Sequence, residues 1–167
     1  MASEPIPAHV RSITRHDCGV SQITLALRGS FRHRPGQYLY VVHPRGGRIP
    51  LSIASAPERL RELELHYRPA PGVAEALLMD DLLAQAARGA DEWNVDGPYG
   101  DVIVEGPTDD ALLLIGGGTG IAQCLCIVEH LRAVAQAHPV RLLWSVTGAS
   151  QLYCDDALRA PAEWFSY

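Results

Sequence analysis

The sequence lacks the features that mark membrane, secreted or nucleic-acid-binding proteins. No apolar run reaches the roughly 18 residues of a membrane-spanning helix. The N-terminal residues lack the basic and then apolar pattern of a secretory signal, so we expect a cytoplasmic location. The net charge is −5, with 19 acidic and 14 basic residues, whereas nucleic acid phosphates select a basic surface. We therefore expect neither a membrane nor a nucleic acid as a partner.

The sequence also lacks the spacings of cysteine and histidine that mark a metal site. The four cysteines are Cys18, Cys124, Cys126 and Cys154. Their spacing matches neither a zinc site nor an iron–sulfur site, and the seven histidines form no His-x-x-x-His pair. We therefore expect reduced structural thiols and no bound metal. The three tryptophans, which we expect in the core, are Trp93, Trp144 and Trp164.

The chain contains enough apolar residues for a packed core, with 47% hydrophobic and 20% charged residues. Up to about residue 104, short segments rich in Val, Ile, Leu and Tyr alternate with glycine and proline turns at roughly ten-residue spacing. This pattern favours a small antiparallel barrel. One helix is predicted over 73–88, ended by Gly89. The last strands are predicted over 92–96 and 101–104, on either side of a turn at 97–100.

The pattern changes near residue 105. The apolar run 111–115 is typical of a buried parallel strand. A glycine-rich turn and a helix follow it, and 141–146 is predicted as a second strand, which completes a βαβ unit. A further helix is predicted over 151–159 and a third strand over 164–167. We therefore predict a β-barrel domain over 1–104 and a partial parallel α/β domain over 105–167.

The glycine-rich turn is the strongest local motif. It consists of Gly116, Gly117, Gly118, Thr119 and Gly120. A helix start presents unpaired N–H groups and about half a positive charge, and glycines let an anion approach the backbone. The turn therefore predicts a dinucleotide phosphate site. Its spacing departs from the strict Rossmann fingerprint, and no acidic residue ends the next strand. A dinucleotide site of another kind, or part of one, is therefore expected.

Four segments, in order, resemble the ferredoxin–NADP reductase superfamily. The glycine-rich turn resembles its nicotinamide-dinucleotide turn. The other three are the P-G-Q-Y turn at 35–38, the flavin motif at 50–57 and the G-P-x-G segment at 97–100 that closes the family's barrel. The resemblance is greatest to NAD(P)H–flavin reductases and oxygenase reductase components. It implies an antiparallel Greek-key barrel for FAD or FMN, followed by a domain for NAD(P)H.

The resemblance also implies which residues bind the two cofactors. Ser52 matches the motif serine and is implied as the catalytic contact to flavin N5. The flavin contacts are Arg48, Pro50, Leu51, Ser52, His66, Tyr67 and Arg68. Arg48 is included because a bulge would bring its side chain to the face of the motif. The dinucleotide contacts are Gly116, Gly117, Gly118, Thr119 and Gly120.

The sequence departs from the family pattern in two ways. Ile49 stands at the family's arginine position and Leu51 at its motif aromatic, which fits a flavin bound as a transient substrate. The sequence also stops at Tyr167, where the family's nucleotide domain has further strands. A half-built parallel sheet exposes an apolar edge and face. We expect a fragment of a longer polypeptide, and the alternative is an oligomer in which another chain covers the incomplete sheet.

The predicted function is hydride transfer from NAD(P)H to FAD, FMN or riboflavin, with electrons leaving on free flavin or through an electron-acceptor protein. Positioning is then the protein's main contribution, and no side chain need act as a base. NADH is preferred to NADPH, because no arginine follows Val146 to bind a 2′-phosphate. One alternative is a reductase component with tightly held FAD. The other is a non-catalytic, degenerate reductase-like module that binds a partner protein.

Overall fold

Six antiparallel strands form a closed barrel in the first part of the chain. The computed structural model describes residues 4–70, 72–106, 110–135, 139–159 and 163–167. The barrel strands are β1 (Ile6–Arg15), β2 (Ser21–Leu27), β3 (Tyr38–Val42), β4 (Arg48–Ser52), β5 (Glu62–Tyr67) and β6 (Glu92–Tyr99). Their order is β4-β3-β6-β1-β2-β5, and a bridge between Ile53 and Leu65 joins the two outer strands. The predicted antiparallel Greek-key barrel is confirmed.

Alternation of apolar and polar residues explains why these segments form barrel strands. Along β2, for example, Ile23 and Leu25 are fully buried, whereas the intervening Thr24 is partly exposed. The buried positions of all six strands meet in one core, which includes Leu39, Leu65 and Trp93, each at most 2% exposed. The predicted core location of this tryptophan is confirmed.

Helix α1 (Ala74–Ala86) packs against the same core. Its buried residues are Met79, Leu82 and Leu83. The backbone N–H of Gly89 donates to the carbonyl of Ala86 at 3.0 Å, and Gly89 adopts a φ of +87°. The glycine therefore ends the helix, as predicted. None of the described helices is long and apolar enough to cross a membrane.

The predicted strand pair around a turn at 97–100 is wrong. Strand β6 runs unbroken through that segment, and 101–104 is not a strand. Gly97 has a φ of +155°, and a β-carbon there would lie 3.1 Å from the β-carbon of Leu39. The register between β3 and β6 also shifts between Tyr38 and Tyr40. The glycine therefore serves the close approach of two strands at an irregularity, where the sequence pattern suggested a turn.

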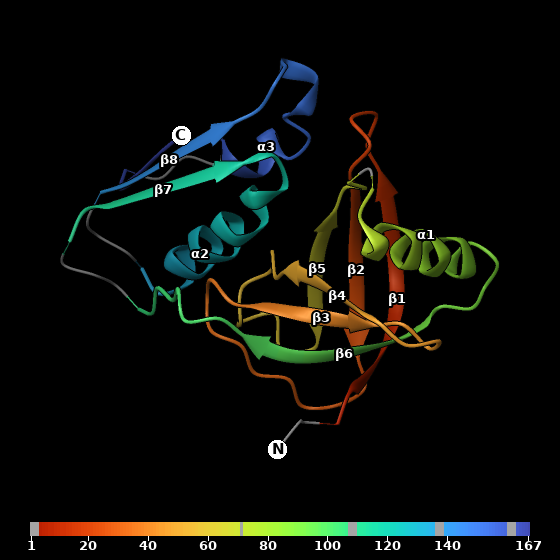
Figure 1. The fold of residues 1–167 in the computed structure, drawn as a ribbon. Coiled ribbons are helices and arrows are strands. Elements are labelled where there is room, and N and C mark those ends of the chain that lie inside the picture. The colour runs from red at the N-terminus through yellow and green to blue at the C-terminus, as the bar shows by residue number, and fades with distance from the viewer. Residues whose placement is uncertain (1–3, 71, 107–109, 136–138, 160–162) are drawn as a thin grey trace.

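A three-stranded parallel sheet follows the barrel. Its strands are β7 (Leu112–Gly117), β8 (Val140–Ser145) and β9 (Phe165–Ser166), in the order β7-β8-β9. The connecting elements are the 3-10 turn η1 (Gly118–Gly120), α2 (Ile121–Ala133), the 3-10 turn η2 (Ala149–Gln151) and the short α3 (Asp155–Leu158). The predicted βαβ unit is confirmed, and the helix predicted over 151–159 is limited to η2 and α3. Helix α2 lies between the parallel sheet and the barrel (Figure 1).

Only one face of the parallel sheet is covered by described residues. Leu142 is 1% exposed and packs against α2, whereas Leu113, Ile115 and Leu143 are 57%, 69% and 51% exposed. The interpretation of 111–115 as a fully buried strand is therefore wrong for the described part of the chain. The continuous apolar run reflects a strand with two apolar faces, one of which packs on α2 here.

Candidate functional site

A pocket of about 380 Å³ lies where β4, the end of β5, the start of α1 and the glycine-rich turn meet. Its lining residues come from both parts of the fold. They are Ile49, Pro50, Leu51, His66, Tyr67, Arg68, Ala70, Val73, Glu75, Ala76 and Thr119. The structure thus brings six of the predicted site residues into one pocket. A mostly apolar pocket with a few polar groups suits a planar ring ligand.

The barrel core supports the floor of this pocket. Ile49 and Leu51 alternate inward along β4 and are 2% and 8% exposed, within the core cluster. The ring of Tyr67 belongs to the same cluster, and its hydroxyl donates to the carbonyl of Ala76 at 3.4 Å. Tyr67 therefore links β5 to the first turn of α1. Leu51 and Tyr67 back the pocket from the core side.

Ser52 lies at the end of β4, beside the pocket and outside its lining. It pairs across the sheet with Tyr38, which pairs in turn with Tyr99 of β6. With Tyr40, these tyrosines form a cluster whose ring centroids lie 5.3–5.8 Å apart. Sequence reasoning missed this aromatic surface. The alternation of tyrosines at 38 and 40 on one face of a strand is the signal that could have found it.

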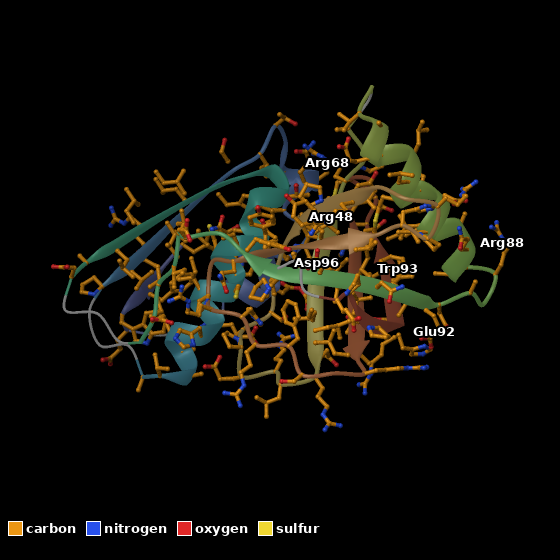
Figure 2. All side chains as sticks on the ribbon, turned by 60° about the horizontal axis from the view of Figure 1, so that its bottom comes forward. Arg48, Arg68, Arg88, Glu92, Trp93 and Asp96 are labelled. Atoms are coloured by element: carbon orange, nitrogen blue, oxygen red, sulfur yellow. The ribbon has the colours of Figure 1, made fainter. Side chains whose placement is uncertain are left out.

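Arg48 crosses β3 to reach Asp96 on β6 (Figure 2). Its Nη2 donates to Asp96 Oδ2 and, at 3.2 Å, to the hydroxyl of Tyr99. The guanidinium also lies 4.2 Å from the centroid of the Tyr40 ring, which is cation–π geometry. The side chain of Asp96 is 8% exposed, so this carboxylate depends on its cation. The flavin contact of Arg48 stays a prediction.

The glycine-rich turn connects β7 to α2. Gly116 and Gly117 are the last residues of β7, and Gly118, Thr119 and Gly120 form the 3-10 turn. A β-carbon on Gly117 or Gly120 would meet no other atom within 4 Å. The backbone of the turn is therefore open on that side, as the approach of an anion requires.

The turn is held by contacts from two other strands. Trp144 of β8 donates from Nε1 to the carbonyl of Gly118 at 2.8 Å. Arg68 follows the end of β5, and its side chain reaches the turn. A β-carbon placed on Gly118 would lie only 3.3 Å from Arg68 Nη2. The Arg68 guanidinium therefore lies beside the turn, and Arg68 also lines the pocket. This cation can bind a phosphate together with the helix-start N–H groups.

One face of α2 fixes the parallel sheet against the barrel. The contacts come from residues three positions apart on the helix, which share a face. Gln123 Nε2 donates to the carbonyl of Gly36 at 2.6 Å, and Cys126 Sγ donates to the carbonyl of Ser55 at 3.0 Å. Glu129 accepts from the backbone N–H of Ala56 at 2.9 Å and from Arg59 Nε at 2.6 Å. Positions 123, 126 and 129 are a sequence signal for this interface. The interface sets the separation between the barrel side of the pocket and the turn.

Acid is expected to destabilise the protein through Glu64 of β5. Burial raises the pKa of Glu64. Hydrogen bonds from His66 and Gln22, both at 2.9 Å, and the charge of Arg59 lower it, and the pKa is below the ordinary value on balance. The ionised Glu64 therefore stabilises the folded protein. This contribution is complete above the unfolded pKa of 4.5 and is lost as the pH falls through the lower folded pKa. In acid titrations of the melting temperature, Glu64→Gln should give a flatter decline than Glu62→Gln. Equal slopes would contradict this account.

Other metal-ligand and thiol groups lie outside this pocket's lining. The four cysteines are free thiols, and Cys124 and Cys126 are buried. Among the described residues, one group of ligand-type side chains lies within 4.8 Å of one another: His9, Asp91 and Glu92. None of these three residues lines the pocket, and His9 already pairs with Asp91 at 3.4 Å.

Comparison with known proteins identifies relatives along nearly the whole chain. No protein-family profile matches. An NAD(P)H-flavin reductase of Vibrio harveyi is 35% identical over 96% of this chain and 68% of the relative. Another of Aliivibrio fischeri is 31% identical over 98% of this chain and 70% of the relative. The crystal structure of the Amycolatopsis cytochrome P450 reductase GcoB superposes with a TM-score of 0.79 at 30% identity, over 93% of this chain and 47% of that one.

Proposed function

This chain belongs to the ferredoxin–NADP reductase superfamily, with NAD(P)H–flavin reductases among its relatives, and on this premise we propose that it transfers a hydride from NAD(P)H to a flavin. One observation carries the proposal. Pro50, His66 and Arg68 of the barrel line the same pocket as Thr119 of the glycine-rich turn. A flavin on the barrel and a dinucleotide on the turn would therefore meet there. The chain spans 68–70% of the two flavin reductases, so the whole protein's activity is part of the proposal.

The residues present fit both ligands. The pocket offers an apolar wall at Pro50 and Leu51, and the turn offers open backbone beside the Arg68 guanidinium. A bound flavin would supply the hydride acceptor for the reduced nicotinamide, and the transfer needs an approach of about 3–3.5 Å. Ser52, which lies beside the pocket and outside its lining, would donate a hydrogen bond toward flavin N5. Arg68, Thr119 and the backbone of 116–120 would hold the NAD(P)H pyrophosphate.

We propose that the flavin is an exchangeable substrate that carries electrons away or passes them to a partner protein. The support is electrostatic. Arg48 is engaged by Asp96, Tyr99 and Tyr40, so its charge is already used within the barrel. Arg68 is the one arginine in the lining of the pocket, among the described residues, and it faces the dinucleotide turn. Few charges are then left for a flavin phosphate, which favours ring recognition of FAD, FMN and riboflavin alike.

Substitution of Arg68 by glutamine tests the proposed function. Removing a charge-assisted phosphate contact should raise the Kd for NADH about tenfold, while riboflavin affinity stays within about threefold. Flavin binding is measured by fluorescence quenching, and NADH oxidation is followed with added flavin. The matched control is Arg88→Gln, at an arginine far from Arg68 (Figure 2) and outside the pocket lining. Both constants should be unchanged in the control.

A non-catalytic, partner-binding module is the second candidate. The exposed apolar face at Leu113, Ile115 and Leu143 and the isoleucine at position 49 favour it. If the parent chain binds neither riboflavin, FMN nor FAD, the reductase proposal fails. A stable complex with a second protein would then support the module. Saturable flavin binding with NADH turnover excludes it.

A further inference from the structure

Tyr153 connects the wall of the pocket to the dinucleotide turn. It lies between η2 and α3, and its hydroxyl is 2.8 Å from Nδ1 of His66, a residue of the pocket lining on β5. Its ring is enclosed by three other rings. Their centroids lie at 5.0 Å for His16, 5.3 Å for His66 and 5.5 Å for Trp144. The barrel and the parallel sheet thus meet on this one side chain.

The contact continues from Tyr153 to the glycine-rich turn. Trp144 meets the Tyr153 ring at an interplanar angle of 85°, which is an edge-to-face arrangement. The indole Nε1 of Trp144 donates to the carbonyl of Gly118 at 2.8 Å. Because this bond fixes the direction of the Gly118 carbonyl, it also fixes the orientation of the Thr119 N–H, which belongs to the same planar peptide. A displacement of Tyr153 would therefore reach the backbone that binds the dinucleotide.

Two hydrogen bonds hold the ring of His66 in place. Nε2 lies 2.9 Å from Glu64 Oε1, and the pKa of Glu64 is below its ordinary value, so the ionised carboxylate accepts this bond. Burial raises the pKa of Tyr153, so the phenol keeps its proton. Within the described residues, His66 Nδ1 is the hydrogen-bond partner of that phenol. The His66 ring therefore bridges Glu64 and Tyr153.

We propose that Tyr153 is a positioning residue for hydride transfer, which holds the His66 ring in the pocket wall and, through Trp144, fixes the dinucleotide turn. The inference rests on the proposed function. The hydroxyl is the hydrogen-bond partner of His66 Nδ1 within the described residues, and the ring supplies the packing surface for Trp144. Both ligands would then be presented to each other at a fixed separation, on which the rate of hydride transfer depends.

Tyr153→Phe separates the two contributions, because it keeps the ring and removes the hydroxyl. With NADH and added riboflavin, kcat should fall about tenfold, while the KM for riboflavin stays within about twofold. In ¹⁵N–¹H NMR spectra of Tyr153→Phe, the His66 ring signals should shift, whereas the backbone amides of Gly118 and Thr119 should stay, because the ring still packs against Trp144. In Tyr153→Leu, which also removes the ring, those two amides should shift. The matched control is Tyr167→Phe, since Tyr167 also donates to a side chain, Asp155, at 2.8 Å. It should change none of these quantities.

The outcomes distinguish this proposal from the proposed function. Unchanged His66 ring signals in a folded Tyr153→Phe protein, or unchanged Gly118 and Thr119 amides in a folded Tyr153→Leu protein, overturn the inference, whatever the activity. Changed His66 ring signals with an unchanged kcat also overturn it, because Tyr153 would then be structural. If the parent chain shows no NADH oxidation, the proposed function fails. The NMR comparison of the Gly118 and Thr119 amides with the control then decides whether Tyr153 fixes the turn.

Discussion

Replacing Gly118 by valine is expected to raise the Kd for NADH at least about 100-fold while riboflavin still binds. Gly118 has a φ of +51°, a conformation that a β-branched residue adopts only with strain. Its β-carbon would also lie 3.3 Å from Arg68 Nη2, so the guanidinium beside the turn would have to shift. Both effects disturb the groups that we propose hold the pyrophosphate. Parallel titrations of the purified variant with NADH and riboflavin measure the two affinities.

Gly89→Val is the matched control for backbone strain. Gly89 has a φ of +87°, and a β-carbon there would meet nothing within 4 Å. The substitution should lower the free energy of unfolding by about 1–2 kcal/mol through strain alone and leave NADH affinity unchanged. An unaltered Kd for NADH in Gly118→Val would mean that the dinucleotide does not bind on this turn. Equal losses of NADH affinity in both variants would point to general destabilisation.

Local patterns were sufficient to predict the elements around the site. Period-two alternation at Ile23 and Leu25 predicts strands, and Gly89 predicts the end of a helix, because both signals act within a few residues. The glycine-rich turn at 116–120 is equally local, since one strand, one turn and one helix make it. These predictions held because neighbouring residues alone determine the geometry.

Contacts between distant segments could not be predicted in the same way. Arg48 of β4 can reach Asp96 of β6 because the sheet order places β3 alone between those two strands. Sequence spacing does not encode this order. Tyr153 meets His66 for a similar reason, since the segment between η2 and α3 packs against the end of β5 and brings the two side chains to 2.8 Å. Gly97 shows a further limit. A glycine–proline pair signals a turn in most sequences, whereas here it allows β6 to approach Leu39 closely.

Leu65→Ala is expected to lower the free energy of unfolding by about 2–5 kcal/mol, the range for a buried leucine replaced by alanine. Leu65 is fully buried, pairs across the sheet with Ile23 of β2, and forms the bridge to Ile53 that closes the barrel. The cavity would open in the core cluster that also contains Leu51 and Tyr67. Because those two side chains back the pocket, riboflavin affinity should fall together with stability. Urea denaturation and fluorescence titration measure the two losses.

The same truncation at an exposed leucine provides the comparison. Leu60 is 80% exposed, so Leu60→Ala should change the free energy of unfolding by less than about 0.5 kcal/mol and leave riboflavin affinity unchanged. A loss below about 1 kcal/mol in Leu65→Ala would mean that β5 does not close the barrel core. A large loss of stability with unaltered riboflavin affinity would instead separate the core from the pocket. In that case the flavin would bind on the outer surface formed by Ser52 and the tyrosines of β3 and β6, where Tyr38 pairs with both Ser52 and Tyr99.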